Sequence, residues 1–138
     1  MENWEAAYIA GIIDGEGSIT LTKMHSKEHR RPCISIPSND REMLVYIKHL
    51  TGGRIYNKKN YNPLKHQNSY TLYIKRKEEV FRILKEIYLY LRIERKKKRA
   101  EWILKYYNIV TPRNGKYNEE SLKKNYYLKK VFLNFSKT

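Results

Sequence analysis

The sequence predicts an α+β domain in which two helix–strand–strand units are followed by further helices. Segments with apolar residues at helical spacing alternate with segments whose apolar residues recur at every second position, the period of a half-buried strand. The strand-like segments occur in two pairs, and each pair is flanked by helical segments. A chain of 138 residues can bury one core without disulfides or metals. We therefore expect the order αββαββα, with a four-stranded antiparallel sheet and extra C-terminal helices.

The first helix is expected from Asn3 to Asp14, with Asn3 as its N-cap. One of its faces has the helical spacing of a core-facing side: Ile9, Ile12 and Ile13. Another face has almost no side-chain bulk: Ala7, Ala10 and Gly11, followed by Asp14. We expect the Gly-x-Gly segment at residues 15–17 to end the helix, because glycine tolerates the positive φ values of many helix exits.

The first pair of strands follows directly. Polar and apolar residues alternate over residues 18–22, which predicts a strand with one buried face. A basic, polar connection covers residues 23–31, and a second strand is expected over residues 33–36. Pro37 is expected to close this strand, because proline cannot donate to a ladder. The two strands should form a hairpin.

The second unit repeats this order. Asn39 or Asp40 is expected to cap a helix that ends at Gly52-Gly53. Its apolar face contains Met43, Leu44, Ile47 and Leu50. Two further strands are expected over residues 54–56 and 69–74, joined by a connection rich in Asn, Lys and Tyr.

Three helices are expected after the last strand, over residues 78–90, 95–107 and about 119–135. Pro112 and Gly115 separate the last two. We therefore interpret residues 1–138 as a single domain with a core of about residues 3–107. A C-terminal helical extension is expected over about residues 116–135.

The charge balance points to a polyanionic partner, because 29 Lys and Arg stand against 14 Asp and Glu, a formal net charge of +15. A membrane partner is not expected, since the uncharged stretch over residues 6–13 is too short to cross a bilayer. The first five residues lack the basic segment of a signal peptide. We expect an intracellular protein of an organelle (chloroplast or mitochondrion), a prokaryote or a phage. Cys33, the only cysteine, is expected to be a small half-buried residue.

Residues 8–17, Tyr-Ile-Ala-Gly-Ile-Ile-Asp-Gly-Glu-Gly, resemble the signature decapeptide of the LAGLIDADG homing endonucleases. Ile replaces Leu twice, and Glu replaces the second Asp. The order of helices and strands from residue 3 to about residue 90 is similar to that family too, so the resemblance covers most of the chain. It implies the homing-endonuclease fold and an intron-encoded, site-specific endonuclease. Such an enzyme makes metal-dependent double-strand breaks in a long, pseudo-palindromic DNA target.

The resemblance also implies a homodimer. Two such helices must pack side by side at a two-fold axis, small residues permit that approach, and this chain contains the motif once. The expected interface residues are Ala7, Ala10, Gly11 and Asp14. Asp14 matches the family's first acid, which is mainly structural, so we interpret it as a packing or capping residue ahead of a direct metal ligand.

Glu16 matches the family's second acidic position and is the candidate catalytic metal ligand, together with the Gly15 carbonyl. Mg²⁺ prefers oxygen donors and takes one or two carboxylates, with water or phosphate completing its shell. Mn²⁺ or Ca²⁺ would suit the same donors. Two such sites near two scissile phosphates could each activate a water and stabilise the leaving 3′ oxygen.

Two more catalytic positions are implied by the resemblance. Lys96 matches a basic residue that family members often carry at the start of a later helix, although Arg95, Lys97 and Lys98 remain alternatives. Ser38, or its neighbour Asn39, occupies the position of a polar residue that is often Gln in the family. A water-positioning role is therefore assigned to Ser38 only by its place.

In the family the sheet lies along the major groove, where each base pair presents a distinct set of contacts. Alternation turns one set of side chains to that groove: Ser18, Thr20, Thr22, Arg31, Cys33, Ser35, Arg54, Tyr56, Lys58, Ser69, Thr71, Tyr73 and Lys75. Further lysines are expected to contact phosphates or to raise the long-range potential: Lys59, Lys65, Lys123, Lys124, Lys129 and Lys130.

Other functions remain open at this point. An intron RNA maturase or a non-cleaving sequence-specific DNA-binding protein could keep the same fold, so RNA is a possible partner beside double-stranded DNA. The 13 tyrosines would also suit a platform on which bases stack. Tyr8, Tyr70 and Tyr106 have core spacing instead and are expected to be buried or half-buried.

Overall fold

A computed structural model describes residues 1–22, 30–110, 130–132 and 134. The elements follow the predicted order: α1 (Asn3–Gly15), β1 (Ser18–Thr22), β2 (Arg31–Ser38), α2 (Arg41–Thr51), β3 (Arg54–Lys58), β4 (Ser69–Ile74), α3 (Lys77–Ile87), the 3-10 turn η1 (Tyr88–Tyr90) and α4 (Glu94–Val110). The α+β class is thus confirmed. The helix expected over about residues 119–135 lies mostly outside the described residues.

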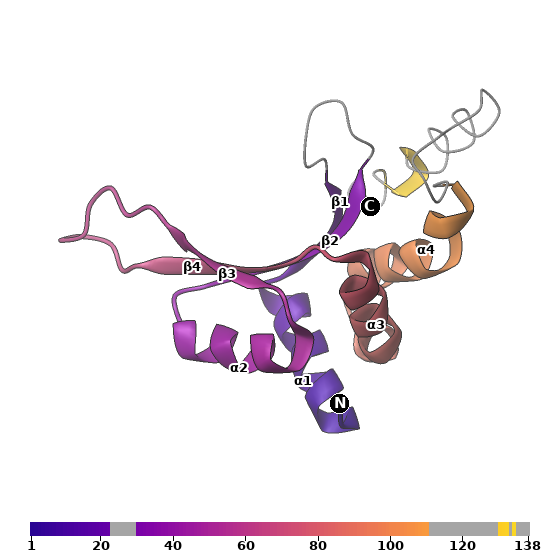
Figure 1. The fold of residues 1–138 in the computed structure, drawn as a ribbon, viewed down its shortest axis with the longest axis horizontal. Coiled ribbons are helices and arrows are strands. Elements are labelled where there is room, and N and C mark those ends of the chain that lie inside the picture. Colours follow the sequence, from indigo (N-terminus) through magenta and orange to yellow (C-terminus); the bar gives the residue numbers. More distant parts are fainter. Residues whose placement is uncertain (23–29, 111–129, 133, 135–138) are drawn as a thin grey trace.

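The four strands form one antiparallel sheet in the order β1-β2-β4-β3. Figure 1 shows α1, α2 and α3 on one side of this sheet, whereas the described helices leave the other side bare. The β3–β4 hairpin extends well beyond α2, away from β1 and α4. The sheet therefore offers one long surface that the described part of the chain does not cover.

Two prolines lie inside β2, so the expectation that Pro37 closes the strand is wrong. Pro32 pairs with β1, and Pro37 pairs with Thr71 of β4. β2 pairs with β1 only as far as Ser35 and with β4 only from Ile34 onward. Each proline therefore sits where β2 has a neighbour on one edge alone, which is where a missing N–H is tolerated.

The core lies between the sheet and the helices. Its largest fully buried side chains come from α1, β1, β2, α2, β4 and α3, together with Phe132: Ile9, Ile13, Ile19, Leu21, Ile34, Ile36, Leu44, Ile47, Leu72, Ile74, Ile83 and Phe132. The strand residues in this set are the ones that alternation assigns to the core. Tyr70 and Tyr106 are half-buried against it as expected, whereas Tyr8 is 41% exposed and packs edge-on against Tyr46.

The ends of α1 differ from the sequence prediction in two details. Glu2 stands at the N-cap in place of Asn3, and its backbone N–H donates to the carboxylate of Glu5 at 2.8 Å. At the other end Gly17 is required for close packing and not for positive φ. A Cβ there would lie 2.9 Å from Cα of Ile13. Among the described glycines only Gly52 and Gly53, which follow α2, have positive φ.

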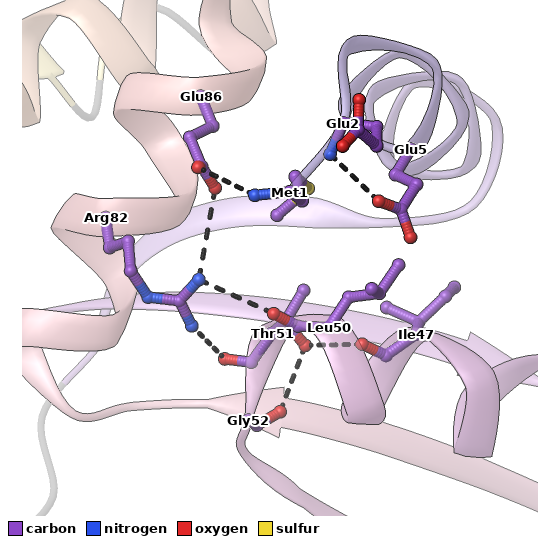
Figure 2. Close-up of polar contacts among 9 residues, drawn as sticks. All are labelled: Met1, Glu2, Glu5, Ile47, Leu50, Thr51, Gly52, Arg82 and Glu86. Carbon is purple, nitrogen blue, oxygen red and sulfur yellow. Dashed lines mark hydrogen bonds and ion pairs between the residues drawn. The ribbon is translucent and has the colours of Figure 1, made fainter.

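A group of polar contacts joins the three helices beneath the sheet (Figure 2). Arg82 on α3 donates to the carbonyls of Thr51 and Leu50 at the end of α2, at 3.3 and 3.5 Å. Glu86, one turn further along α3, lies 3.9 Å from Arg82 and 3.3 Å from the amino group of Met1. These contacts satisfy carbonyls that a helix end leaves without partners, and they fix α2 and α3 relative to α1.

Within the described residues, no helix has the length and apolar character needed to cross a membrane.

Candidate functional site

The end of α1 and the start of α4 hold each other by reciprocal hydrogen bonds. The Asp14 carboxylate accepts the backbone N–H groups of Arg92 and Ile93, at 2.7 and 3.2 Å. In return the Nζ of Lys96, on the first turn of α4, donates to the carbonyls of Ile13 and Asp14, both at 2.7 Å. Asp14 thus joins the end of α1 to the segment that precedes α4, which is the packing role among the two roles that its sequence position suggests, and the last turn of α1 is fixed.

Lys96 is one of the few buried charged residues in the described part of the chain, with 7% of its surface exposed. Burial lowers the pKa of its amine, and the nearby Asp14 carboxylate acts in the opposite direction. The sequence left Arg95, Lys97 and Lys98 open as alternatives. The structure brings Lys96 to the end of α1, where its amine holds the backbone that leads to Glu16.

A cleft of about 390 Å³ opens beside the end of α1, at the junction of β2, β3 and β4. Its lining residues are Glu16, Pro37, Ser38, Asn39, Asp40, Lys58, Ser69, Tyr70 and Thr71. Glu16 is exposed because it follows the last residue of α1 and none of the described elements covers it. The hydroxyl oxygen of Ser38 accepts the N–H of Asp40 at 2.9 Å, which holds Ser38 at the cleft.

The cleft therefore brings Glu16 and Ser38 together, as the sequence analysis expects, but Lys96 is not among its lining residues. Lys58 shares the cleft with Glu16 instead. Sequence reasoning gave Lys58 only a DNA-contacting role on the sheet, because nothing local connects the end of β3 with the end of α1. Asp40, expected only as a possible helix cap, also lines the cleft.

The oxygen donors at this cleft fit a hard divalent cation. In the ranges that the structure describes, no three His, Cys, Asp or Glu residues gather to enclose a metal. Glu16 supplies one exposed carboxylate, and the carbonyl of Gly15 ends α1, where helix carbonyls lack partners within the helix. Mg²⁺ commonly binds through one or two protein carboxylates and takes its remaining ligands from water and phosphate. An open site of this kind suits such a cation.

One stripe of α1 is left uncovered by the described residues. Ala7 and Gly11 are exposed, and a Cβ added at Gly11 or at Gly15 would meet no atom within 4 Å. Trp4 continues the stripe and is 65% exposed. Ala10, which the sequence analysis placed on this face, is instead fully buried in the chain's own core. That placement was wrong because the inward face of α1 also needs a small residue where it packs.

The bare side of the sheet carries the side chains that alternation predicts. Every member of the following set is exposed or half-buried: Ser18, Thr20, Thr22, Arg31, Ser35, Arg54, Tyr56, Lys58, Ser69, Thr71, Tyr73 and Lys75. No strand contains Asp or Glu. Ser18 and Ser35 lie opposite each other and their hydroxyls are 2.8 Å apart. The surface is thus polar, cationic and able to donate and accept hydrogen bonds.

One position on this surface differs from simple alternation, and a neighbouring group of side chains is ordered by ring contacts. Cys33 is 3% exposed, and burial raises the pKa of its thiol, with Lys75 and Thr22 nearby. It is therefore not a surface donor. Lys75 reaches over the ring of Tyr73, at 4.7 Å from the ring centroid, and Tyr73 packs edge-on against Tyr56. These contacts order the three long side chains on the sheet.

Comparison with known proteins finds one matching protein family and several solved structures with a similar fold. A family model described as LAGLIDADG endonuclease matches residues 9–106. The fold is similar to that of the homing endonuclease I-CvuI in complex with I-CreI target DNA, with a TM-score of 0.74 and 16% identity over 96% of this chain and 82% of that one. No curated protein sequence matches.

Two more solved structures share the fold. The archaeal intron-encoded homing endonuclease I-Vdi141I, complexed with DNA, gives a TM-score of 0.65 at 20% identity over 98% of this chain and 86% of that one. The meganuclease I-AabMI, bound to uncleaved DNA, gives 0.65 at 21% identity over 93% of this chain. This chain spans only 43% of I-AabMI.

Proposed function

The chain belongs to the LAGLIDADG endonuclease family, and we propose that it is a site-specific homing endonuclease. In this proposal a homodimer makes a metal-dependent double-strand break in a long, pseudo-palindromic DNA target. The observation that carries it is the cleft in which Glu16 lies exposed beside Ser38 and Lys58, at the edge of a cationic sheet surface.

The sheet surface supports a duplex DNA substrate. Its hydroxyl and basic side chains stand in rows at strand spacing, and none of the four described strands carries an acid that would repel phosphate. A β-ribbon of this kind can enter the major groove and read base edges there. Arg31, Arg54 and Lys75 would contact phosphates or guanine, and the serines and threonines would contact either base edges or backbone.

At the cleft, Glu16 and the Gly15 carbonyl would hold the divalent cation, and Mg²⁺ fits these donors. A bound cation of this kind lowers the pKa of a water molecule and stabilises the charge of the leaving oxygen. Ser38 is placed to orient a water molecule, because its hydroxyl keeps a proton to donate while its oxygen accepts the Asp40 N–H. Lys58 would lie against the scissile phosphate and stabilise the negative charge that develops on it.

Lys96 and Asp14 act on this site through the backbone. They fix the last turn of α1 from opposite sides of the α1–α4 contact, so Gly15 and Glu16 start from a rigid helix end. Such support matters because a shift of about 1 Å in a reacting group can cost roughly a hundredfold in rate. We therefore assign Lys96 a positioning role.

The open stripe of α1 supports the homodimer. Its small residues let a second helix approach closely, and the exposed Trp4 and Tyr8 beside them would bury apolar surface away from water on association. An isologous contact between two copies of α1 would place both copies of Glu16 near the two-fold axis. One cut in each strand would follow from this symmetry.

The test is cleavage of a randomised plasmid library by the purified chain, with Mg²⁺ or with EDTA. We expect recovery of one family of sites that are cut on both strands only when Mg²⁺ is present. Glu16→Gln should bind the recovered duplex and leave it intact, whereas Glu16→Asp should retain slow cutting. A wild-type chain that leaves every member of the library uncut would overturn the proposal, and splicing activity on its host intron would then favour a maturase.

A further inference from the structure

The β3–β4 hairpin continues beyond the cleft into a loop of residues 59–68. Lys58 pairs with Ser69 where the two strands end, and both line the cleft that holds Glu16. β1 also begins in this region, at Ser18, and runs away from the hairpin loop to its end at Thr22. The cleft therefore lies between the β1–β2 end of the sheet and the hairpin loop, which extends beyond α2 in Figure 1.

This loop is held in one shape by its own hydrogen bonds. The side-chain amide of Asn60 donates to the carbonyl of His66 at 2.7 Å and to Asn68 at 3.2 Å, and its oxygen accepts the N–H of Asn62 at 3.0 Å. The Asn62 carbonyl accepts the N–H groups of Lys65 and His66, at 3.0 and 2.9 Å. A loop ordered in this way loses little further entropy when it binds a partner.

The tip of the loop is apolar and its base is cationic. Leu64 is 98% exposed and Tyr61 is 85% exposed, the two highest values among the large hydrophobic residues that the structure describes. Lys59 lies 5.0 Å from the centroid of the Tyr61 ring, and Lys65 follows Leu64 directly. The sequence contains no Asp or Glu between Glu42 and Glu78. This charge pattern selects a polyanion as the partner.

A surface that met only phosphates would not need an exposed leucine. Proteins that enter the minor groove of DNA do use apolar side chains such as leucine, which press between base steps while basic residues bind the flanking phosphates. The geometry is compatible with this groove. A duplex turns its other groove to the same side after about half a helical turn, roughly 17 Å. The six residues from Lys59 to Leu64 could span at most about 20 Å if fully extended, which is enough to cover this distance.

We propose that Leu64 and Tyr61 form an apolar wedge that enters the minor groove of the target duplex, on the far side of the cut from the DNA that contacts β1 and β2. Lys59 and Lys65 bind the phosphates on either side of this groove. The wedge favours base steps that open easily, so it contributes to site preference through deformability and not through base-edge hydrogen bonds. This inference rests on the proposed DNA substrate.

The first experiment maps the tip on DNA. Leu64→Cys and Thr22→Cys, each in a Glu16→Gln background, carry an iron–EDTA reagent and are bound to a 60-bp duplex that the wild type cuts. Labelling is confined to the new thiol because Cys33 is buried and its thiol pKa is raised, and treated Glu16→Gln chain without a new cysteine measures the background. A two-fold symmetric dimer carries each probe twice, so we expect the Thr22 probe to cut the DNA outside the two scissile positions and the Leu64 probe to cut it between them.

Cuts from both probes outside the two scissile positions, or cuts from the Thr22 probe alone, would overturn the wedge while leaving DNA binding intact. If neither probe cuts the duplex and the chain does not bind it, the proposed function is refuted, and the wedge with it. The two failures are therefore distinguishable.

The second experiment measures what the wedge contributes. Leu64→Ala should weaken binding to the cut site about fivefold or more and leave the salt dependence unchanged, because it removes apolar contact and no charge. Leu64→Met should largely restore binding. Leu89→Ala is the matched control, since Leu89 is 61% exposed on η1 and lies outside the hairpin. Equal effects of Leu64→Ala and Leu89→Ala would refute the proposal.

Discussion

Replacing Gly11 by alanine should affect the folded chain and its dimer in opposite directions. Within one chain an added Cβ would meet no atom within 4 Å, so it creates no clash. Gly11 lies inside α1, and alanine is favoured over glycine in a helix interior by about 1 kcal/mol. The unfolding free energy of the isolated chain should therefore rise by roughly this amount.

In the proposed dimer the same methyl group would lie between two closely packed copies of α1. Overpacking of this kind typically costs about 1–3 kcal/mol. The dissociation constant should rise by roughly 5- to 150-fold, since each 1.4 kcal/mol is a factor of ten. Cleavage at protein concentrations near the wild-type dissociation constant should also fall, by a smaller factor than the dissociation constant rises, because the released monomer partly offsets the weaker association.

Urea unfolding over a range of protein concentrations, together with sedimentation equilibrium, separates the two effects. Asn108→Ala is the control, because Asn108 is exposed on α4 and the substitution improves helix propensity away from α1. It should stabilise the chain slightly and leave association unchanged. Unaltered dimerisation in Gly11→Ala would show that the open stripe of α1 is not the interface, and a destabilised chain would contradict the open space around Gly11.

Four further outcomes are expected. Gly17→Ala should lower the unfolding free energy by about 1–3 kcal/mol in urea titrations, because its Cβ would lie 2.9 Å from Cα of Ile13; unchanged stability would contradict this packing. Lys96→Met should lower Tm and slow cleavage while DNA affinity persists, whereas Lys98→Met, at an exposed lysine of the same helix, should do neither. Burial lowers the pKa of Lys96 in the folded chain. Between this lowered pKa and 10.5, the folded chain therefore binds fewer protons than the unfolded chain. The unfolding free energy of the wild type, relative to that of Lys96→Met, should rise with pH across this interval and stay flat below it. Binding to the cut site should weaken as salt rises, and the eight sheet-face cations of a dimer should contribute about −7 to the log–log slope, of which Arg54→Gln should remove about 2; a slope near zero would contradict an electrostatic sheet surface.

Local sequence patterns determined most of the fold. The period-two segments that contain Ile19, Leu21, Ile34, Ile36 and Leu72 became strands with those side chains buried. The helical segments formed where apolar spacing placed them, within a few residues at each end. Such patterns succeed because a strand or helix with one apolar face has to turn that face inward, whatever it packs against.

The candidate site was predictable in its parts and not in its assembly. Glu16 and Ser38 were identified from the motif and from their place after α1 and β2, and they do share a cleft. The sequence could not choose Lys96 among four adjacent basic residues, since that choice depends on the angle at which α4 meets the end of α1. It also could not bring Lys58 to Glu16, because 42 positions separate them along the chain.

What the sequence by itself determined was the set of elements, the inward and outward faces of the strands, the motif with Glu16 and the cationic character of the surface. Only the tertiary structure decided that Ala10 faces inward while Gly11 faces outward, and that β2 continues through Pro37. It also decided that Lys96 holds the last carbonyls of α1, whereas Lys58 lines the cleft. The physical reason is that the first group depends on the period and chemistry of neighbouring residues. The second depends on register and crossing angles between elements that are distant in the chain, and those are set only when the core packs.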